Sequence, residues 1–199
     1  SLDEIPEAMV EAAIAIEDKR FYEHQGVDWT RTILGVVKSG FEQGGSTITQ
    51  QLAKQLYSPT ASNIFERALQ KPIEWVIATN LERLYTKEEI ITMYLNQSPY
   101  GGRRNGVESA AKTYFGKSAK DLTLAESALL AAIPNNPGVL NPYNVYGNEM
   151  LIERQHKVLD DMVSMGYITE EEAKAAKEVA ILDTIQPEAS QYADILAPH

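Results

Sequence analysis

A mostly α-helical fold is predicted for this chain of 199 residues on three observations. Apolar side chains recur with the period of an α-helix along most of the sequence. The segments Thr86–Glu89, Thr123–Glu126 and Thr169–Glu172 match the capping box, in which a threonine and a later glutamate satisfy the free N–H groups of a helix start. No pair of alternating strands is evident, so little sheet is expected.

The first expected helix covers Ile5–Asp18, where the apolar residues at positions 5, 9, 12, 13 and 16 share one face. Further helices are expected wherever the same period runs between breakers such as Pro134–Pro137, and three of them follow the capping boxes. In chain order these are Asp28–Phe41, Thr47–Tyr57, Phe65–Leu84, Ile90–Asn96, Val107–Phe115, Ser127–Ile133, Glu149–Met165 and Ala173–Val179. After about residue 180 the period fades, so residues 1–180 are predicted to form one domain and 181–199 a linker.

Composition excludes several classes of protein. The chain is 44% hydrophobic and 23% charged, which is typical of a globular domain with one core or one core plus a small lobe. It contains no cysteine, which excludes a disulfide scaffold, a zinc-thiolate site and a thiol nucleophile. The net charge of −10 argues against nucleic acid as a partner, because that partner requires a basic surface. The longest purely apolar run, Ala128–Ile133, is too short to span a membrane.

Glu17 ends the first expected helix and opens Glu17–His24, a segment of mixed charges. A carboxylate that leaves an apolar helix face can be partly withdrawn from water, which suits it to accept a proton. The simpler interpretation, which the pattern alone favours, is a solvated helix end. His24 taken alone is typical of a structural residue that forms hydrogen bonds.

A second candidate site lies in Gly44–Lys54. Thr47 and Gln50 have the spacing of a capping box, and Ser46, Gln50 and Lys54 are four residues apart, so they are expected on one helical face. Glycines, hydroxyls, amides and a lysine at a helix start favour the binding of a phosphate or a sugar. The alternative is an ordinary capped surface helix.

Glu74 is a third candidate, because it lies inside a long expected helix next to Trp75. It is either a buried functional acid or the polar edge of an amphipathic helix, and the pattern does not choose. Pro72 is expected to kink this helix unless a helix starts there. Two separated carboxylates and an anion site together favour chemistry at a glycosidic centre, where one acid activates a hydroxyl and cations hold a charged leaving group.

Five motifs follow one another in order between about residues 5 and 178. They are Glu17-Asp18 with Phe21, His24 and Gly26; Gly45–Leu52; Lys71 and Glu74, then Tyr94–Asn96; Gly106 with Ala110-Ala111 and Tyr114–Gly116; and Ala128–Ala131 followed by Pro134 and Pro137. In this order they resemble the glycosyltransferase family 51 domain, the peptidoglycan polymerase module of class A penicillin-binding proteins and of their monofunctional relatives.

The resemblance implies a lysozyme-like α-helical fold with a larger head lobe and a smaller, mobile, membrane-facing jaw lobe at about residues 28–45. It implies that Glu17 is the general base and Glu74 the second catalytic glutamate. It assigns substrate binding to Phe21, Ser46, Gln50, Gln51, Lys54, Arg67 and Lys71. Gln70 and Ile73 stand where the family usually has basic residues, which predicts weaker binding of a diphosphate.

The implied reaction joins lipid II units into β-1,4-linked glycan strands, with inversion and release of polyprenyl diphosphate. No cofactor and no metal ligand follows from the sequence, and a need for a divalent cation is left open. The implied partners are lipid II, the growing glycan strand, the membrane surface and a fused transpeptidase domain. The implied location is the extracytoplasmic face of the bacterial cytoplasmic membrane.

Two other functions stay open on the sequence. A lysozyme-like hydrolase would keep the fold but needs a general acid and a site for water, whereas a polymerase needs Lys54 and its neighbours. The second alternative is a catalytically weak glycan-binding module, which is favoured by the absence of basic residues at Gln70 and Ile73. Binding of lipid II without product would select this module.

Overall fold

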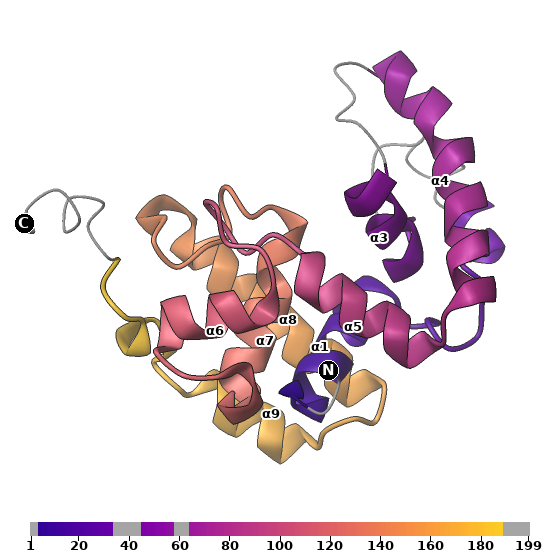
Figure 1. Cartoon of the computed structure of the whole chain (residues 1–199). Coiled ribbons are helices and arrows are strands. Elements are labelled where there is room, and N and C mark those ends of the chain that lie inside the picture. The colour runs from indigo at the N-terminus through magenta and orange to yellow at the C-terminus, as the bar shows by residue number, and fades with distance from the viewer. Residues whose placement is uncertain (1–3, 34–44, 58–63, 189–199) are drawn as a thin grey trace, which may run out of the picture.

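Helices make up most of the structure, which is a computed structural model (Figure 1). It describes residues 4–33, 45–57 and 64–188, and for residues 64–69 it describes the backbone alone. The helices are α1 (Glu7–Glu17), α3 (Ile48–Tyr57), α4 (Ile64–Leu84), α5 (Lys87–Gln97), α6 (Val107–Phe115), α7 (Leu124–Ala132), α8 (Asn148–Ser164) and α9 (Glu170–Lys177). Short 3-10 helices are η3 (Ala119–Asp121), η4 (Ile133–Asn135), η5 (Val145–Gly147) and η6 (Ile181–Thr184). The described residues contain a single isolated β-bridge, between Pro99 and Asn105. The predicted mostly α-helical class is therefore confirmed.

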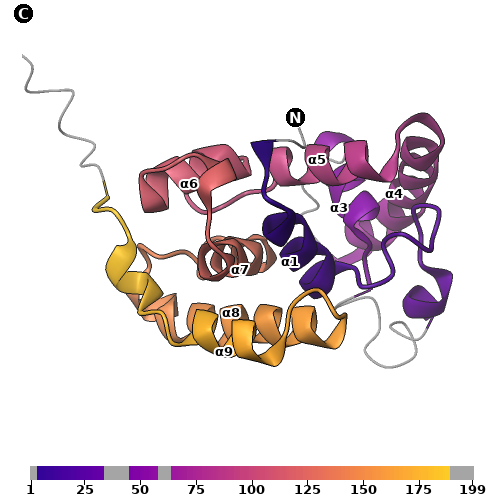
Figure 2. The same cartoon turned by 90° about the horizontal axis from the view of Figure 1, so that it is seen from below.

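The centre of the core is α7. Its segment from Ala125 to Ala132 is buried throughout, because its sequence is apolar on nearly every face. It packs against both α1 and α8, and α9 covers α8. Figure 2 shows α7 in the middle, with α6 on one side and α8 and α9 on the other. This packing fixes the direction of α1, whose last residue is Glu17.

A second packed group consists of α3, α4 and α5, with α3 against both of the others. A loop connects α1 to a helical segment at residues 29–33, and it packs closely against α4 at Gly26. Gly26 has a φ of +92°, and a Cβ atom there would lie 2.8 Å from the backbone of Ala78. Only glycine accepts that conformation and that approach without strain. The rings of Trp29 and Trp75 meet edge to face at 5.3 Å, which also ties the 29–33 segment to α4.

Helix starts follow the predicted capping boxes. Thr86, Thr123 and Thr169 each accept a hydrogen bond from the backbone of the glutamate three residues later, whose side chain accepts one in return. Thr47 and Gln50 form the same pair at the start of α3: the Thr47 N–H donates to Gln50 Oε1 at 2.8 Å, and the Gln50 N–H donates to Thr47 Oγ1 at 3.1 Å. These four starts are therefore confirmed as local features of the sequence.

Two expectations about the helices can be compared with the structure. Pro72 lies inside α4 and no helix starts there, so the expected kink at Pro72 stays a prediction. The helix expected at Asp28–Phe41 is seen at residues 29–33, and the remainder, with most of the jaw lobe expected at 28–45, lies outside the described residues.

The predicted linker does not begin at residue 181. Ile181 is buried, Ile185 packs against the core, and the Gln186 N–H donates to the Tyr114 carbonyl at 2.8 Å. Arg104 pairs with Glu188 at 3.1 Å, and its guanidinium lies over the rings of Tyr114 and Tyr143. Residues 181–188 therefore belong to the packed domain, and the expected linker at 189–199 lies outside the described residues.

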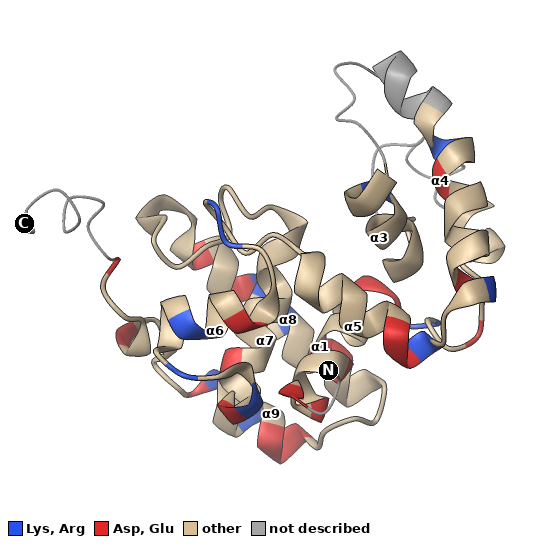
Figure 3. Ribbon diagram, viewed as in Figure 1, with Lys and Arg blue, Asp and Glu red and all other residues tan. Residues whose placement is uncertain are grey.

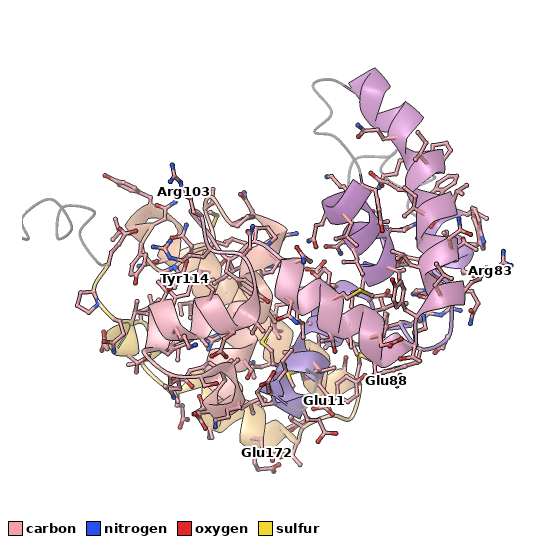
Figure 4. The ribbon with its side chains drawn as sticks, in the orientation of Figure 1. Glu11, Arg83, Glu88, Arg103, Tyr114 and Glu172 are labelled. Atoms are coloured by element: carbon pink, nitrogen blue, oxygen red, sulfur yellow. The ribbon has the colours of Figure 1, made fainter. Side chains whose placement is uncertain are left out.

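Charge is distributed unevenly over the molecule. Figure 3 shows acidic residues along the edge formed by α9 and the starts of α1 and α5. Figure 4 labels Glu11, Glu88 and Glu172 on this edge, with Arg103 on the opposite side of the domain. None of the described helices is long and apolar enough to cross a membrane.

Candidate active site

The carboxylate of Glu17 is held from two sides at the end of α1. Its Oε2 accepts a hydrogen bond from Gln51 Nε2 of α3 at 2.9 Å, and its Oε1 pairs with Arg154 Nη2 of α8 at 3.1 Å. Only 13% of the Glu17 side chain is exposed. The backbone carbonyl of the same residue accepts from Arg31 Nη1 at 2.7 Å. The two arginines offset the negative end of the α1 dipole, which would otherwise disfavour a carboxylate at this position.

The orientation of the Gln51 amide follows from its other partner. The Tyr94 hydroxyl donates to Gln51 Oε1 at 3.4 Å, so the amide nitrogen faces Glu17. Burial, and then the negative charge of Glu17, raise the pKa of Tyr94 well above its usual value. The Tyr94 hydroxyl therefore stays protonated, and the chain of donors from Tyr94 through Gln51 ends on the Glu17 carboxylate.

Asp18 joins the end of α1 to the start of α3. Its buried Oδ2 accepts from the Ile48 N–H at 3.0 Å and lies 2.8 Å from His24 Nε2. The Gly26 N–H donates to His24 Nδ1 at 3.2 Å, so the proton of the imidazole is assigned to Nε2, which donates to Asp18. The prediction that His24 is a structural residue is confirmed. Its network sets the position of α3 relative to Glu17.

Glu74 lies at the other end of the same site and is buried, with a side chain 4% exposed. Lys71 Nζ lies 2.9 Å from Glu74 Oε2 and 3.0 Å from Ser46 Oγ, so one ammonium group bridges the acid and the residue before the α3 cap. Of the two interpretations of Glu74, the buried acid is confirmed. The polar edge of α4 is excluded at this position.

The two glutamates are thus connected to opposite ends of the segment Ser46–Gln51. Gln51 contacts Glu17, while Ser46 contacts the Lys71 that pairs with Glu74. Lys54 is exposed and lies three residues beyond Gln51, so both project from neighbouring positions on α3. The structure brings five of the predicted residues together around the first half of α3, whereas Lys54 lies in the last turn of that helix. The five are Glu17, Ser46, Gln51, Lys71 and Glu74.

The expected stripe of Ser46, Gln50 and Lys54 on one helical face is wrong. Ser46 precedes the cap of α3 and is not helical. The Gln50 side chain folds back to accept from the Thr47 N–H and is buried, so it serves the helix cap. The neighbouring Gln51 is the glutamine that reaches Glu17.

Phe21 does not line the site in this structure. Its side chain is fully buried, and Lys87 Nζ lies 4.5 Å from the centre of its ring. Lys87 also donates to the His24 carbonyl and pairs with Glu82, which accepts from Thr49 of α3. Phe21 therefore supports the loop after Glu17 from within the core, and its expected role in substrate binding is corrected because its side chain is fully buried. Arg67 belongs to α4, but its side chain lies outside the described residues.

Arg154 is the contact that sequence reasoning missed. It lies 137 residues from Glu17 in the chain, so no local spacing could connect the two. The sequence predicts that Arg154 lies on a helix. It does not predict which way the side chain faces, because that depends on how α8 packs against α1 and α7. Among the described residues there is no group of three or more side chains suited to bind a metal ion.

Comparison with known proteins places the chain in a family. A family described as transglycosylase matches residues 1–163. The chain is 42% identical to penicillin-binding protein 1A of Vibrio cholerae and 42% identical to penicillin-binding protein 1F of Bacillus subtilis, over 91% and 89% of its length. It is 41% identical to penicillin-binding protein 1A of Escherichia coli over 91% of its length. It covers only 22%, 24% and 21% of these relatives.

A solved structure of penicillin-binding protein 1A from Haemophilus influenzae matches 89% of this chain and 17% of that one, at 25% identity and a TM-score of 0.48. The chain belongs to the transglycosylase family found in class A penicillin-binding proteins, and it is a peptidoglycan glycosyltransferase domain. Its mostly helical architecture agrees with the lysozyme-like fold of this family, whereas the division into head and jaw lobes stays a prediction.

Proposed function

We propose that this domain polymerises lipid II, with Glu17 as the general base. The observation that carries the proposal is that both oxygens of the partly buried Glu17 carboxylate accept hydrogen bonds, from Gln51 and from Arg154. The two donors fix the direction of the carboxylate, and a fixed direction is what a general base requires for proton transfer.

In the proposed reaction, the 4-hydroxyl oxygen of the acceptor sugar attacks the anomeric carbon of the growing strand. Its proton passes to Glu17 while the bond between that carbon and the diphosphate oxygen breaks. The configuration at the carbon inverts, and polyprenyl diphosphate leaves with the bonding electron pair. A β-1,4 linkage is the product.

The leaving diphosphate requires positive charge, and Lys54 and Lys71 supply it in this proposal. Lys71 bridges Ser46 and Glu74, so its ammonium is held beside the start of α3. Lys54 is exposed in the last turn of the same helix. Ammonium groups near a developing phosphate charge stabilise the transition state. Glu74 keeps Lys71 in place, which is the role that we propose for the second glutamate.

The proposed setting is the extracytoplasmic face of the bacterial cytoplasmic membrane, with lipid II, the growing strand and a fused transpeptidase domain as partners. Exposed apolar side chains support contact with a lipid surface. They lie on the 29–33 segment, at the end of α3 and along α4: Trp29, Ile33, Leu56, Tyr57, Ile73 and Val76. Trp and aliphatic side chains of this kind favour the interface between lipid and water.

Hydrolysis is the competing reaction, and product analysis separates the two. The domain is incubated with fluorescent lipid II and, in parallel, with purified cell wall. We expect a ladder of polymer from lipid II and no soluble fragments from the wall. Soluble fragments without polymer would establish the hydrolase, and binding of lipid II without either product would establish the glycan-binding module.

A further inference from the structure

Arg154 is anchored before it reaches Glu17. Its Nε donates to the carbonyl of Ala132, the last residue of α7, at 3.1 Å. That carbonyl lies where α7 ends and η4 begins, so the arginine is held at the negative end of the α7 dipole. The second contact is Nη2 on Glu17 Oε1, also at 3.1 Å. The planar guanidinium is therefore fixed at two points, on α7 and on α1.

The opposite oxygen of Glu17 is held by a different part of the molecule. Gln51 belongs to α3, which packs against α4 and α5, whereas Arg154 belongs to α8, which packs with α1 and α7. The Glu17 carboxylate thus lies between two packed groups of helices, with one donor from each. Among the described residues, the other hydrogen bond shown to the carboxylate comes from the neutral Gln51 amide, which Tyr94 holds in turn.

We infer that Arg154 is a positioning residue for Glu17, which fixes the plane and direction of the carboxylate for the proton transfer. The inference rests on the proposed function of Glu17 as the base. It gives Arg154 a role in the rate of the chemical step and not in the affinity for substrate. A displacement of about 1 Å in a catalytic group can lower a rate by about a hundredfold.

The kinetic test compares Arg154→Ala, Arg154→Lys and the wild type with fluorescent lipid II, and Lys157→Ala serves as control. Lys157 is on the same helix one turn away, is 61% exposed and pairs with Asp161. We expect Arg154→Ala to lower kcat by about ten- to a hundredfold with KM changed less than about threefold, Arg154→Lys to keep part of the rate, and Lys157→Ala to match the wild type.

Addition of guanidinium ion at millimolar concentration distinguishes positioning from a general loss of structure. We expect it to raise the rate of Arg154→Ala and to leave the wild type and Arg154→Lys unchanged. A raised KM with an unchanged kcat would overturn the inference, because Arg154 would then bind substrate. A lowered kcat that neither lysine nor guanidinium improves would overturn it as well.

A crystal structure of Arg154→Ala tests the same inference without activity. We expect the Glu17 carboxylate to leave its place, with the distance from Oε2 to Gln51 Nε2 rising beyond about 3.5 Å. A carboxylate that keeps its place and its bond to Gln51 would overturn the inference. Failure of the wild type to polymerise lipid II would instead refute the proposed function, and the crystal structure would still decide the role of Arg154.

Discussion

Two adjacent acids at the end of α1 have different tasks. Glu17 presents its carboxylate to donors from α3 and α8, whereas Asp18 is buried and binds the start of α3. The difference arises because neighbouring residues at the end of a helix point in different directions. Asp18 is thus a structural residue whose loss should act on stability first.

Replacement of Asp18 by alanine leaves two buried donors without an acceptor, the His24 Nε2–H and the Ile48 N–H. Each buried donor left unpaired costs about 1–3 kcal/mol, so we expect Asp18→Ala to lower the free energy of unfolding by about 2–4 kcal/mol. Urea denaturation measures it, with the exposed Asp121→Ala as control. An unfolding free energy equal to that of the control would contradict this account of Asp18.

Individual site residues could be predicted only where a local motif carries them. Glu17, Lys71 and Glu74 follow from their motifs, but Gln50 and Gln51 are adjacent and chemically identical. Which of the two turns to Glu17 depends on the phase of α3, and that phase is set by the Thr47–Gln50 cap. Arg154 could not be predicted, since its contact with Glu17 depends on tertiary packing alone.

At the scale of helices, capping explains why most of the fold could be predicted. The boxes at Thr86, Thr123 and Thr169 are complete within four residues, so their information is local. The packing of residues 181–188 on the domain could not be predicted in this way. Two apolar residues, Ile181 and Ile185, are too few to show a helical period, and the segment is held by contacts with the core and with α6, which are distant in sequence.

The junction of α1 and α8 gives a pH-dependent prediction. Burial would raise the pKa of Asp161, but hydrogen bonds from Lys19 and Lys157 outweigh it, and the net pKa lies below the ordinary value of 3.8. A lowered pKa in the folded state means that the ionised group stabilises the protein above about pH 4 and that this contribution is lost as the pH falls through the folded pKa.

We therefore expect Asp161→Asn to be less stable than the wild type at pH 7, and the difference to disappear as the pH falls below 3.8 and through the lowered pKa of Asp161. The difference at pH 7 should be below about 1 kcal/mol, because both lysines are largely exposed. Thermal unfolding of the two proteins across this pH range measures it. A difference that stays constant or grows as the pH falls would contradict the assignment.

For the whole molecule, the placement of apolar and charged residues predicts how the domain meets a membrane. Trp29 and Val76 are 56% and 62% exposed and lie on the 29–33 segment and on α4, near the Trp29–Trp75 contact. Acidic residues gather on a different edge, formed by α9 and the starts of α1 and α5 (Figure 3). The domain should therefore approach lipid with the face of the 29–33 segment and α4.

Flotation with vesicles of phosphatidylcholine tests this orientation. This lipid has no net charge, so the vesicles neither attract nor repel the domain through its net charge of −10. We expect the double variant Trp29→Ser with Val76→Ser to bind at least about tenfold more weakly, because each side chain contributes about 1.5–3 kcal/mol when buried. The control is Val145→Ser with Tyr146→Ser, residues that are 71% and 95% exposed on η5. Equal losses in both double variants would refute the proposed face.

The most direct measurement for the whole account is the single-turnover rate of lipid II coupling by Glu17→Gln beside the wild type. Glutamine keeps the shape of the side chain but cannot accept the proton, so we expect the rate to fall by about 10²–10⁴-fold while lipid II still binds. Circular dichroism and thermal unfolding confirm that the variant is folded. A folded Glu17→Gln that couples lipid II within a factor of about three of the wild-type rate would contradict the assignment of Glu17 as the base.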